Sequence, residues 1–417
     1  MCSNVLRAFC DLHIHSRYSR ATSEMMTLQE ITHYAVMKGL NIVGTGDSTH
    51  PLWIAEVKER LVEEENGFLR MKESRSNQFY ALSGEVSTIY KENGSTKMIH
   101  HVLLLPNVEC AEQANDLLCH FGNLESDGRP ILNCSSPELV EFLTEVSDWI
   151  EIFPAHIWTP HFSIFGVHGF NSIGECYGDR AHKIHALETG LSSDPPMNWR
   201  LSSLDNYVLV SNSDSHSPWP WRLGREANLF DLKEMSYKEM ILALRREGRS
   251  RLLMTIETHP QYGKYHWSGH RNCKVKRSPK ESAILGDICP KCGKRFTKGV
   301  EQRVSELADR ELGYRPPNAI DYAHLLPLAE VIAAVYGIEY ASSVKVWQTY
   351  NKLIEGCGSE FSVMLEAKPE KLEMLGDKRL KDAIMMVRED QVTVDPGYDG
   401  VYGILRLGGI SRGVSDG

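Results

Sequence analysis

Short apolar segments recur between about residues 5 and 258, and stretches with helical periodicity separate many of them. Eight of these segments predict β-strands, at Leu6–Ile14, Asn41–Thr45, Phe79–Val86, Met98–Leu105, Trp149–Ile157, Ile184–Glu188, Tyr207–Ser211 and Leu252–Ile256. The intervening stretches predict helices, which include Thr27–Lys38, Pro51–Glu65, Pro137–Val146 and Ser236–Glu247. Repeated strand–helix units predict a parallel sheet, and seven or eight units in about 250 residues favour a closed α/β barrel over an open sheet.

The pattern changes after Glu257, where basic residues and paired cysteines replace the apolar segments. Helical periodicity returns at Ile320–Tyr336 and Ser342–Ile354, and the stretch Phe361–Leu407 predicts a strand, a helix and a Gly-rich end. We therefore expect four parts: a barrel at 1–256, a basic module at 257–315, a helical domain at 316–357, and a C-terminal segment at 358–417.

Composition narrows the class of protein. The chain has 417 residues, a formal charge of −9 and no uninterrupted apolar run long enough to span a membrane. The first residues show no signal peptide, so we expect a cytoplasmic protein that does not bind membranes. Its ten cysteines then suggest thiols and metal ligands rather than disulfides.

Histidines and carboxylates occur at or beside the ends of most predicted strands. The motifs are Asp11-Leu12-His13-Ile14-His15, Asp47-Ser48-Thr49-His50, Gly84-Glu85, His100-His101, Ala155-His156 and Asp214-Ser215-His216. His13 and His15 are two residues apart, so on a strand they share one face and can converge on one ion. Imidazole and carboxylate ligands without thiolates suit hydrolytic metal centres. One such histidine alone would more often be structural, and adjacent His100 and His101 cannot both face inward on a strand.

The order of these motifs resembles the PHP (polymerase and histidinol phosphatase) superfamily. The resemblance implies a distorted (β/α)7 barrel that holds two or three divalent ions (Zn, Mn or Mg) and cleaves phosphoesters. It implies a first ion on His13, His15, Glu85 and Asp214, with Glu85 bridging to a second ion on His101 and His156.

A third position would use His216, His50 and Asp47, and the implied catalytic residues are Glu85, Asp214 and His216. The chain departs from the usual pattern where two residues separate Asp47 from His50, and where Arg20 replaces an acidic residue. Both departures concern the third position.

A second candidate metal site lies in the basic module. His270-x-x-Cys273 and Cys289-x-x-Cys292 have the spacing of a structural zinc site, with His266 as the alternative nitrogen ligand and ordinary thiols as the alternative interpretation. Eleven basic and three acidic residues lie between Lys264 and Arg303, a local charge of +8. A rigid basic module in an acidic protein favours nucleic-acid binding over a merely solvated face.

The chain as a whole resembles the endonuclease Q family of repair nucleases. The resemblance rests on Pro154–Pro160 with Phe165-Gly166, Ser213–Pro218, Gly263–His266, the two cysteine motifs, Leu325–Glu330 and Pro396–Gly403, the last of which also resembles a segment of superfamily-one DNA helicases. It implies cleavage of the phosphodiester on the 5′ side of hypoxanthine, uracil, xanthine or an abasic site. DNA would then be the partner and the nucleoid the location, while a replication clamp or other repair proteins stay open as further partners.

Recognition of a damaged base usually requires flipping the base and stacking it on aromatic groups. The candidate DNA contacts are Tyr18, Trp158, Phe165, Arg222, Lys264 and Arg271, with His161, Phe162, Trp219 and Trp221 as further candidates. Core packing is the alternative for each aromatic residue. Two other functions stay open: a PHP phosphatase acting on small phosphate esters, and a DNA-binding protein whose catalytic site has decayed.

Overall fold

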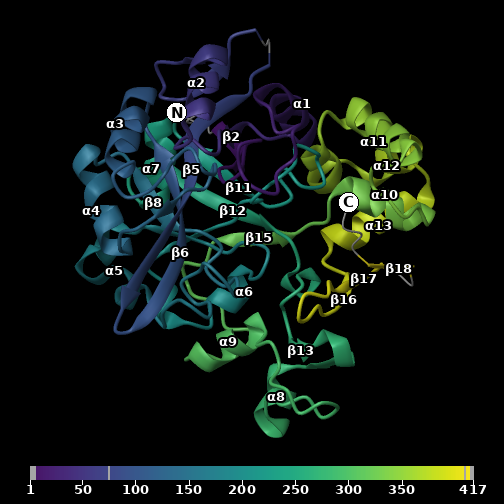
Figure 1. The fold of residues 1–417 in the computed structure, drawn as a ribbon. Helices are drawn as coiled ribbons and strands as arrows, with labels where there is room; N and C mark the ends of the chain where they lie inside the picture. The colour runs from purple at the N-terminus through teal and green to yellow at the C-terminus, as the bar shows by residue number, and fades with distance from the viewer. Residues whose placement is uncertain (1–5, 74–75, 408–409, 414–417) are drawn as a thin grey trace. The chain divides into compact units, whose positions relative to one another are not determined.

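The computed structural model describes residues 6–73, 76–407 and 410–413, which fall into two compact units (Figure 1). The first unit comprises Met1–Ile157, His161–Gly190 and Asn206–Ile256, and the second comprises Trp158–Pro160, Leu191–Asp205 and Glu257–Gly417. The four-part division at 256, 315 and 357 stays a prediction. Its first part includes residues 1–5 and 74–75, and its last part includes 408–409 and 414–417, all outside the described ranges.

Seven strands of the first unit follow one another around a ring. They are β1 (Leu6–Asp11), β2 (Ile42–Gly44), β5 (Phe79–Glu92), β6 (Ser95–Leu105), β8 (Glu151–Pro154), β9 (Ala186–Glu188) and β10 (Val208–Val210). Strand β2 lies parallel to both β1 and β5, and β9 lies parallel to β10. Strand β6 lies antiparallel to both of its neighbours, β5 and β8.

Hydrogen bonds beyond the strand ends complete the ring. The Ile157 amide after β8 donates to the Glu188 carbonyl at 3.0 Å, and the His15 amide after β1 donates to the Ser215 carbonyl at 2.9 Å. The predicted α/β barrel is therefore confirmed. The predicted parallel sheet is correct for β1, β2 and β5 and for β9 and β10, and wrong for β6 and β12 (Arg251–Glu257), which lie antiparallel to their neighbours.

The reversal of β6 has a local cause in the turn that precedes it. Asn93 and Gly94 connect β5 to β6 with φ values of 49° and 77°. Positive φ at both central residues is typical of the type I′ turn, whose twist matches that of a two-stranded antiparallel hairpin, and Asn-Gly is its preferred sequence. This hairpin signal was present in the sequence and was not used in the prediction.

Further strands and helices surround the ring. Strands β11 (Ala227–Leu232) and β12 (Arg251–Glu257) extend the sheet beyond β1 in antiparallel order. The expected helices are present as α1 (Leu28–Lys38), α2 (Pro51–Arg60), α4 (Ser136–Val146) and α7 (Tyr237–Leu244), joined by α3 (Val108–Leu118) and α5 (Ile173–Tyr177). The helix expected over Pro51–Glu65 ends at Arg60, because the chain continues as strand β3 (Leu61–Glu63). Thr27 and Ser236 cap α1 and α7 by accepting hydrogen bonds from the amides of Glu30 and Glu239.

The second unit contains small sheets and a group of helices. The basic module includes β13 (Ser268–His270), β14 (Val275–Arg277), α8 (Pro279–Leu285) and α9 (Val300–Leu307). The remaining elements are α6 (Pro195–Asn198), β15 (Asp321–His324), α10 (Leu328–Tyr336), α11 (Val344–Cys357), η5 (Ser362–Glu366), α12 (Pro369–Leu375), α13 (Lys378–Arg388), β16 (Thr393–Asp395), β17 (Ile404–Leu407) and β18 (Ile410–Gly413).

Two expectations for this unit are wrong. The helix expected over Ile320–Tyr336 is strand β15 followed by α10, because Pro327 disfavours helical backbone at Leu326 and instead precedes the first turn of α10. The strand expected from Phe361 is the helical segment η5, whose Val363 and Met364 are buried. A short apolar run fits a buried helix as well as a buried strand.

Among the described residues, no helix combines the length and the apolar character that crossing a bilayer requires.

Candidate functional site

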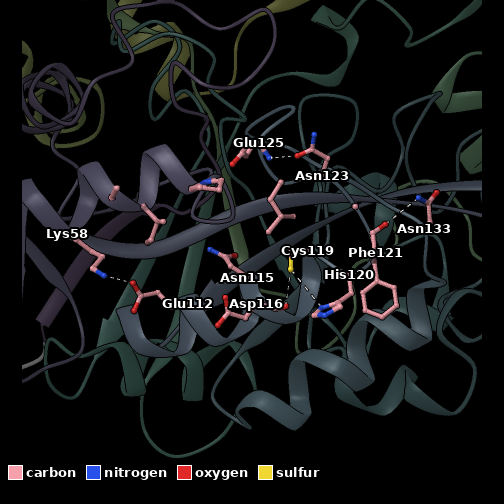
Figure 2. Close-up of a pocket in the computed structure, with 15 residues that line it drawn as sticks. Lys58, Glu112, Asn115, Asp116, Cys119, His120, Phe121, Asn123, Glu125 and Asn133 are labelled. Carbon is pink, nitrogen blue, oxygen red and sulfur yellow. Dashed lines mark hydrogen bonds and ion pairs between the residues drawn. The ribbon is translucent and has the colours of Figure 1, made fainter.

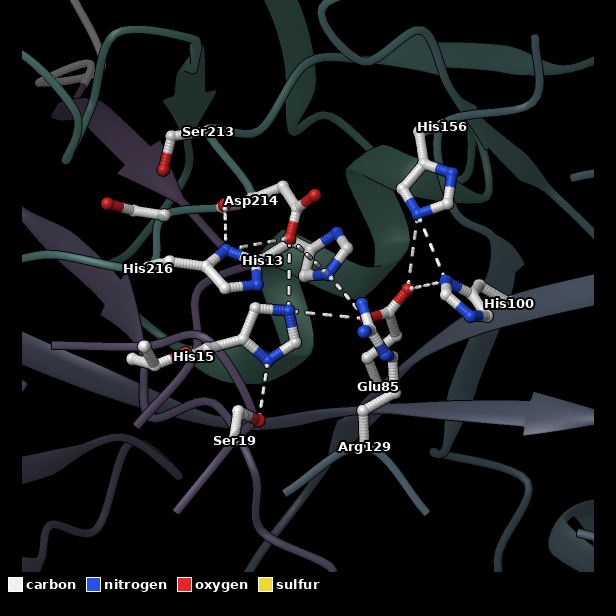
Figure 3. Close-up of polar contacts among 12 residues, drawn as sticks. His13, His15, Ser19, Glu85, His100, Arg129, His156, Ser213, Asp214 and His216 are labelled. Carbon is white, nitrogen blue, oxygen red and sulfur yellow. Dashed lines mark hydrogen bonds and ion pairs between the residues drawn. The ribbon is translucent and has the colours of Figure 1, made fainter. Parts of the chain in front are cut away.

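Four ligand atoms converge where β1, β5 and the segment after β10 meet (Figure 3). The Nε2 atom of His15 lies 3.2 Å from Glu85 Oε2 and 3.0 Å from Asp214 Oδ1. The Nε2 atom of His13 lies 3.5 Å from Glu85 Oε2 and 3.7 Å from Asp214 Oδ1. The structure therefore brings together the four residues expected to hold the first ion.

A second group of ligand atoms shares Glu85. Its Oε1 atom lies 2.7 Å from His100 Nδ1 and 3.2 Å from His156 Nε2, and these two nitrogens are 3.2 Å apart. One carboxylate thus contributes one oxygen to each group, as the predicted bridging role requires (Figure 3).

The histidine of the second group is His100, and the choice of His101 was wrong. In the β5–β6 ladder, Ser87 is paired with His100 and Val86 with His101. Directly paired residues point to the same face of a sheet, and Glu85 shares its face with Ser87, so His100 faces Glu85 while His101 faces away. His101 instead bonds the Tyr177 hydroxyl at 2.9 Å and the Thr88 hydroxyl at 3.0 Å.

The protonation state of His100 suits a ligand. Burial lowers the pKa of His100 to about 4, against the opposing effect of Glu85. His100 is therefore neutral at neutral pH, which leaves a nitrogen lone pair free to bind a cation.

The distances between the imidazole nitrogens and carboxylate oxygens fit coordination of metal ions better than direct hydrogen bonds. The Nε2 atom of His13 is buried without a hydrogen-bond partner among the described residues, although two carboxylate oxygens lie within 3.7 Å. Zinc–ligand bonds of about 2.0–2.2 Å place neighbouring tetrahedral ligands roughly 3.4 Å apart, which is the spacing found here. The residues present therefore fit a divalent ion in each group.

Backbone strain is concentrated at these residues. His156, Asp214 and Asp47 all have positive φ, at 28°, 47° and 45°. Side chains other than glycine rarely adopt this conformation, and it persists where the surrounding structure holds it for function. A Cβ atom on Gly190 would lie 2.6 Å from His156 Cβ, so glycine is required beside this strained histidine.

Glu188 is a functional residue that the sequence analysis missed. Both of its oxygens lie 3.0 Å from His13 Nδ1, and Oε2 also accepts from the His156 amide at 2.8 Å. Metal-binding histidines commonly donate their second ring N–H to a carboxylate, which fixes the tautomer and makes the ligand nitrogen more basic. Its position at the end of a predicted strand was the only signal for it.

Glu188→Gln is expected to weaken metal binding to the barrel by about 10–100-fold, because a neutral amide supports the His13 ligand less well. Titration of zinc into the metal-free full chain measures this. Glu151→Gln is the matched control, since Glu151 is also buried and bonds a histidine, His185, at 2.8 Å. Equal zinc affinities in the two variants would contradict the role given to Glu188.

The residues expected at a third metal position do not form a group of their own. Asp47 Oδ1 lies 3.0 Å from His15 Nδ1, so Asp47 orients a ligand of the first group. The His50 ring stacks on Tyr18 at a centroid distance of 4.6 Å, and the His216 ring lies 4.4 Å from that of His15. The metal-ligand groups within the described ranges do not include these three residues, and a third ion stays a prediction.

Arg129 also reaches the metal groups and was not predicted. Its Nη1 atom lies 3.2 Å from Glu85 Oε2, and the side chain is partly exposed (Figure 3). A guanidinium at this place provides a positive charge that can contact a phosphate group.

The cysteine module assembles as its spacing predicted. His270, Cys273, Cys289 and Cys292 place one ligand atom each within 4.8 Å of the others. His266, the alternative ligand, instead pairs with Glu301 at 3.3 Å. Three thiolates and one imidazole are typical of a structural zinc site, and the four residues fit that ion.

The residues predicted to contact DNA have different surroundings. Trp158 and Phe165 are each only 2% exposed, and Trp158 Nε1 donates to Asn198 at 2.7 Å, so their burial gives no support to base stacking. Tyr18 and Arg222 are half-buried, while Lys264 and Arg271 are exposed. DNA contact by these six residues stays a prediction.

A cavity of about 1020 Å³ lies elsewhere in the first unit (Figure 2). Residues of α2, of α3 and of the segment after α3 line it, among them the ion pair of Lys58 and Glu112. Its lining includes no residue of the metal-ligand groups, so we do not assign the chemistry to it.

Comparisons with known proteins connect this site to a family. The family model of the MJ0043 C-terminal domain matches residues 327–391. The crystal structure of the lesion-specific endonuclease PfuEndoQ from Pyrococcus furiosus is 33% identical, with a TM-score of 0.87 and coverage of 96% of both chains.

Two further relatives match along nearly the whole chain. A crystal structure of endonuclease Q in complex with a 27-mer duplex substrate that carries an abasic lesion at the active site is 33% identical, with a TM-score of 0.85 and coverage of 96% of this chain and 97% of that one. The uncharacterised protein YqxK of Bacillus subtilis is 29% identical over 96% of this chain and 99% of its own length. The resemblance expected from the motifs is confirmed, and the chain belongs to the endonuclease Q family.

Proposed function

We propose that this protein is a metal-dependent endonuclease that hydrolyses the phosphodiester on the 5′ side of deaminated bases and abasic sites in DNA. The observation that carries the proposal is the arrangement of Glu85, which contributes one oxygen to each of two histidine-containing groups. Two adjacent divalent ions form a recurrent centre for the cleavage of phosphate esters. The PfuEndoQ relative is a lesion-specific endonuclease, which supports the choice of DNA over small phosphate esters.

Metal ions held by these residues would supply positive charge that polarises the phosphoryl group and lowers the pKa of a water molecule, which makes it easier to convert that water into a nucleophile. Glu85 and Asp214 hold negative charge at the centre. Burial raises the pKa of Asp214, but His15, His13 and His216 outweigh this and keep that carboxyl ionised. Arg129, at the edge of the same groups, is placed to contact a phosphate oxygen.

His216 is the candidate for proton transfer. Its side chain is about one-third exposed, and its Nδ1 atom lies 2.9 Å from the Asp214 carbonyl oxygen, so Nδ1 donates there and Nε2 is left for a substrate or water. Burial and the neighbouring His15 lower the pKa of His216. A neutral histidine whose Nε2 carries a lone pair can accept a proton from a water molecule, so His216 is the proposed general base.

The basic module is the proposed DNA-binding surface. Its lysines and arginines include the exposed Lys264, Arg271, Lys274, Lys291, Lys294 and Arg295, and a zinc ion on the four ligands would hold them in one rigid arrangement. Contacts with phosphates are sequence-independent and weaken with salt, so we expect binding to duplex DNA to decrease steeply as ionic strength rises.

Cleavage of defined duplexes tests the function. Labelled duplexes that carry one inosine, uracil or abasic site are incubated with the full chain and Mg, Mn or Zn, and the cut is mapped. We expect a cut 5′ of the lesion in the wild-type chain and none in Asp214→Asn, which keeps the shape of the side chain and removes a ligand charge.

The same protein preparation also tests the alternative function, a phosphatase acting on small phosphate esters. Hydrolysis of p-nitrophenyl phosphate without cleavage of any lesion-containing duplex would replace the nuclease proposal. The decayed-site alternative predicts fewer than two ions bound by the two barrel ligand groups.

A further inference from the structure

A further group of metal-type ligands lies in the second unit, apart from the cysteine module. His259 follows β12, His324 is the last residue of β15, and Asp390 follows the end of α13. The Oδ1 atom of Asp390 lies 3.2 Å from His259 Nε2 and 3.3 Å from His324 Nδ1. One carboxylate oxygen and two imidazole nitrogens from three different elements therefore converge on one point.

The two imidazole rings are stacked against each other. Their centroids are 4.1 Å apart at an interplanar angle of 29°, and both side chains are less than 10% exposed. Two stacked imidazolium rings in a poorly solvated place would repel each other, because like charges at this distance interact strongly away from water. A cation shared by two neutral rings removes that conflict and uses both lone pairs.

A second carboxylate fixes the orientation of His324. Asp194, the N-cap of α6, places Oδ2 3.2 Å from His324 Nε2, while its Oδ1 accepts from the Met197 amide at 2.9 Å. His324 can therefore donate Nε2–H to Asp194 and direct its Nδ1 lone pair toward Asp390 and His259. A carboxylate behind a histidine is the arrangement that supports ligating histidines in metal sites.

Asp390 gives the group access to solvent. Its side chain is 54% exposed, and its backbone has φ 53°, a conformation that aspartate and asparagine tolerate better than most residues. The remaining coordination position of an ion at this point would face water, so exchange with ions in solution does not require the unit to open.

We propose that His259, His324 and Asp390 bind a divalent transition-metal ion, separate from the barrel ions and from the cysteine module. Two imidazoles and one carboxylate suit zinc best among abundant ions, with water as the fourth ligand. The ion would tie the segment after β12 and strand β15 to the end of helix α13, and so fix the last helix of the C-terminal group. This role is structural and does not depend on the nuclease activity.

An ion pair without metal is the competing explanation. Burial lowers the pKa of His324, but Asp194 and Asp390 outweigh this and raise it to about 9, so the metal-free histidine is charged and paired. A metal ion would have to displace that proton. Metal content separates the two explanations.

The test compares bound zinc in three full-length proteins, each saturated with zinc, desalted and measured by mass spectrometry of the metal. Asp390→Asn removes a ligand charge while asparagine tolerates the same backbone conformation. Glu389→Gln is the matched control, since it removes the same charge one residue earlier, outside the group. We expect Asp390→Asn to hold one zinc ion fewer than the wild type, and Glu389→Gln to hold as many as the wild type.

His259→Gln provides a second variant on a different element, and thermal unfolding checks that each protein is folded. Loss of one ion in both Asp390→Asn and His259→Gln supports the site. Equal zinc content in the wild type, Asp390→Asn and Glu389→Gln would show that the residues form an ion pair only. Loss of more than one ion from Asp390→Asn would also overturn the proposal, because it would indicate a general disturbance rather than a single separate site.

Discussion

Glu85→Gln is expected to remove both barrel ions and to reduce cleavage of a lesion-containing duplex by about 10³-fold or more, since the charge of the ions lowers the activation barrier by several kcal/mol. Glu85 is the only residue that contributes to both ligand groups among those that the structure describes. An amide has no charge to neutralise two cations, and its nitrogen cannot act as a ligand.

The same substitution should destabilise the metal-free protein. Burial raises the pKa of Glu85, but His100, Arg129 and His13 outweigh it, and the pKa lies well below its ordinary value. Removing Glu85 leaves the partly exposed Arg129 without its charged partner and the neighbouring histidines without an acceptor, at a cost of about 1–3 kcal/mol. We therefore expect a lower melting temperature for metal-free Glu85→Gln than for the metal-free wild type.

Metal content and single-turnover cleavage measure the first effect. Glu85→Asp keeps the charge but shortens the side chain by one methylene group, so its carboxylate should no longer reach both ligand groups. We therefore expect this variant to bind one barrel ion rather than two. Full retention of two barrel ions by Glu85→Gln, with cleavage reduced less than tenfold, would contradict the bridging role.

Much of the site could be predicted because the spacing of residues within a motif determines how their side chains lie relative to one another. His13 and His15 share a face through the two-residue period of a strand, and the structure places both against Asp214. The spacing of Cys289 and Cys292 likewise fixes two ligands within one turn. The pairing of Glu85 with two groups came from the family resemblance rather than from spacing.

Other parts depend on contacts between distant segments, which one sequence does not reveal. Glu188 lies 175 positions from His13 and has no motif around it, so only the fold shows that it supports a ligand. The family resemblance assigned Asp47 to a third metal position. In the structure its oxygens accept hydrogen bonds from Ser16 and Ser19 and orient His15.

The choice between His100 and His101 depends both on local residue spacing and on the pairing of two strands. The sequence establishes that only one of them faces inward. Which one depends on the register of β6 against β5, and that register is set by the tight turn at Asn93-Gly94. A shift of one residue would exchange the two side chains. His101 was chosen through the family resemblance, which gave no information on this register.

This adjacent pair therefore provides the most selective test of the site. His100→Gln is expected to lose the second ion and to reduce lesion cleavage by about 10²–10³-fold, because the removed nitrogen is one of three ligands in that group. His101→Gln should keep both ions and most of the activity. It should lower stability by about 1–3 kcal/mol, because the hydroxyls of Tyr177 and Thr88 lose a buried partner.

Metal content, cleavage rate and denaturant unfolding of the two variants are compared under the same conditions. The substitution is identical and both histidines are buried, so differences in metal content report which face each side chain occupies rather than the loss of a histidine in general. If His101→Gln lost the ion and His100→Gln kept it, the β5–β6 register would have to be shifted by one residue. The second ligand group would then be the one that the sequence first suggested.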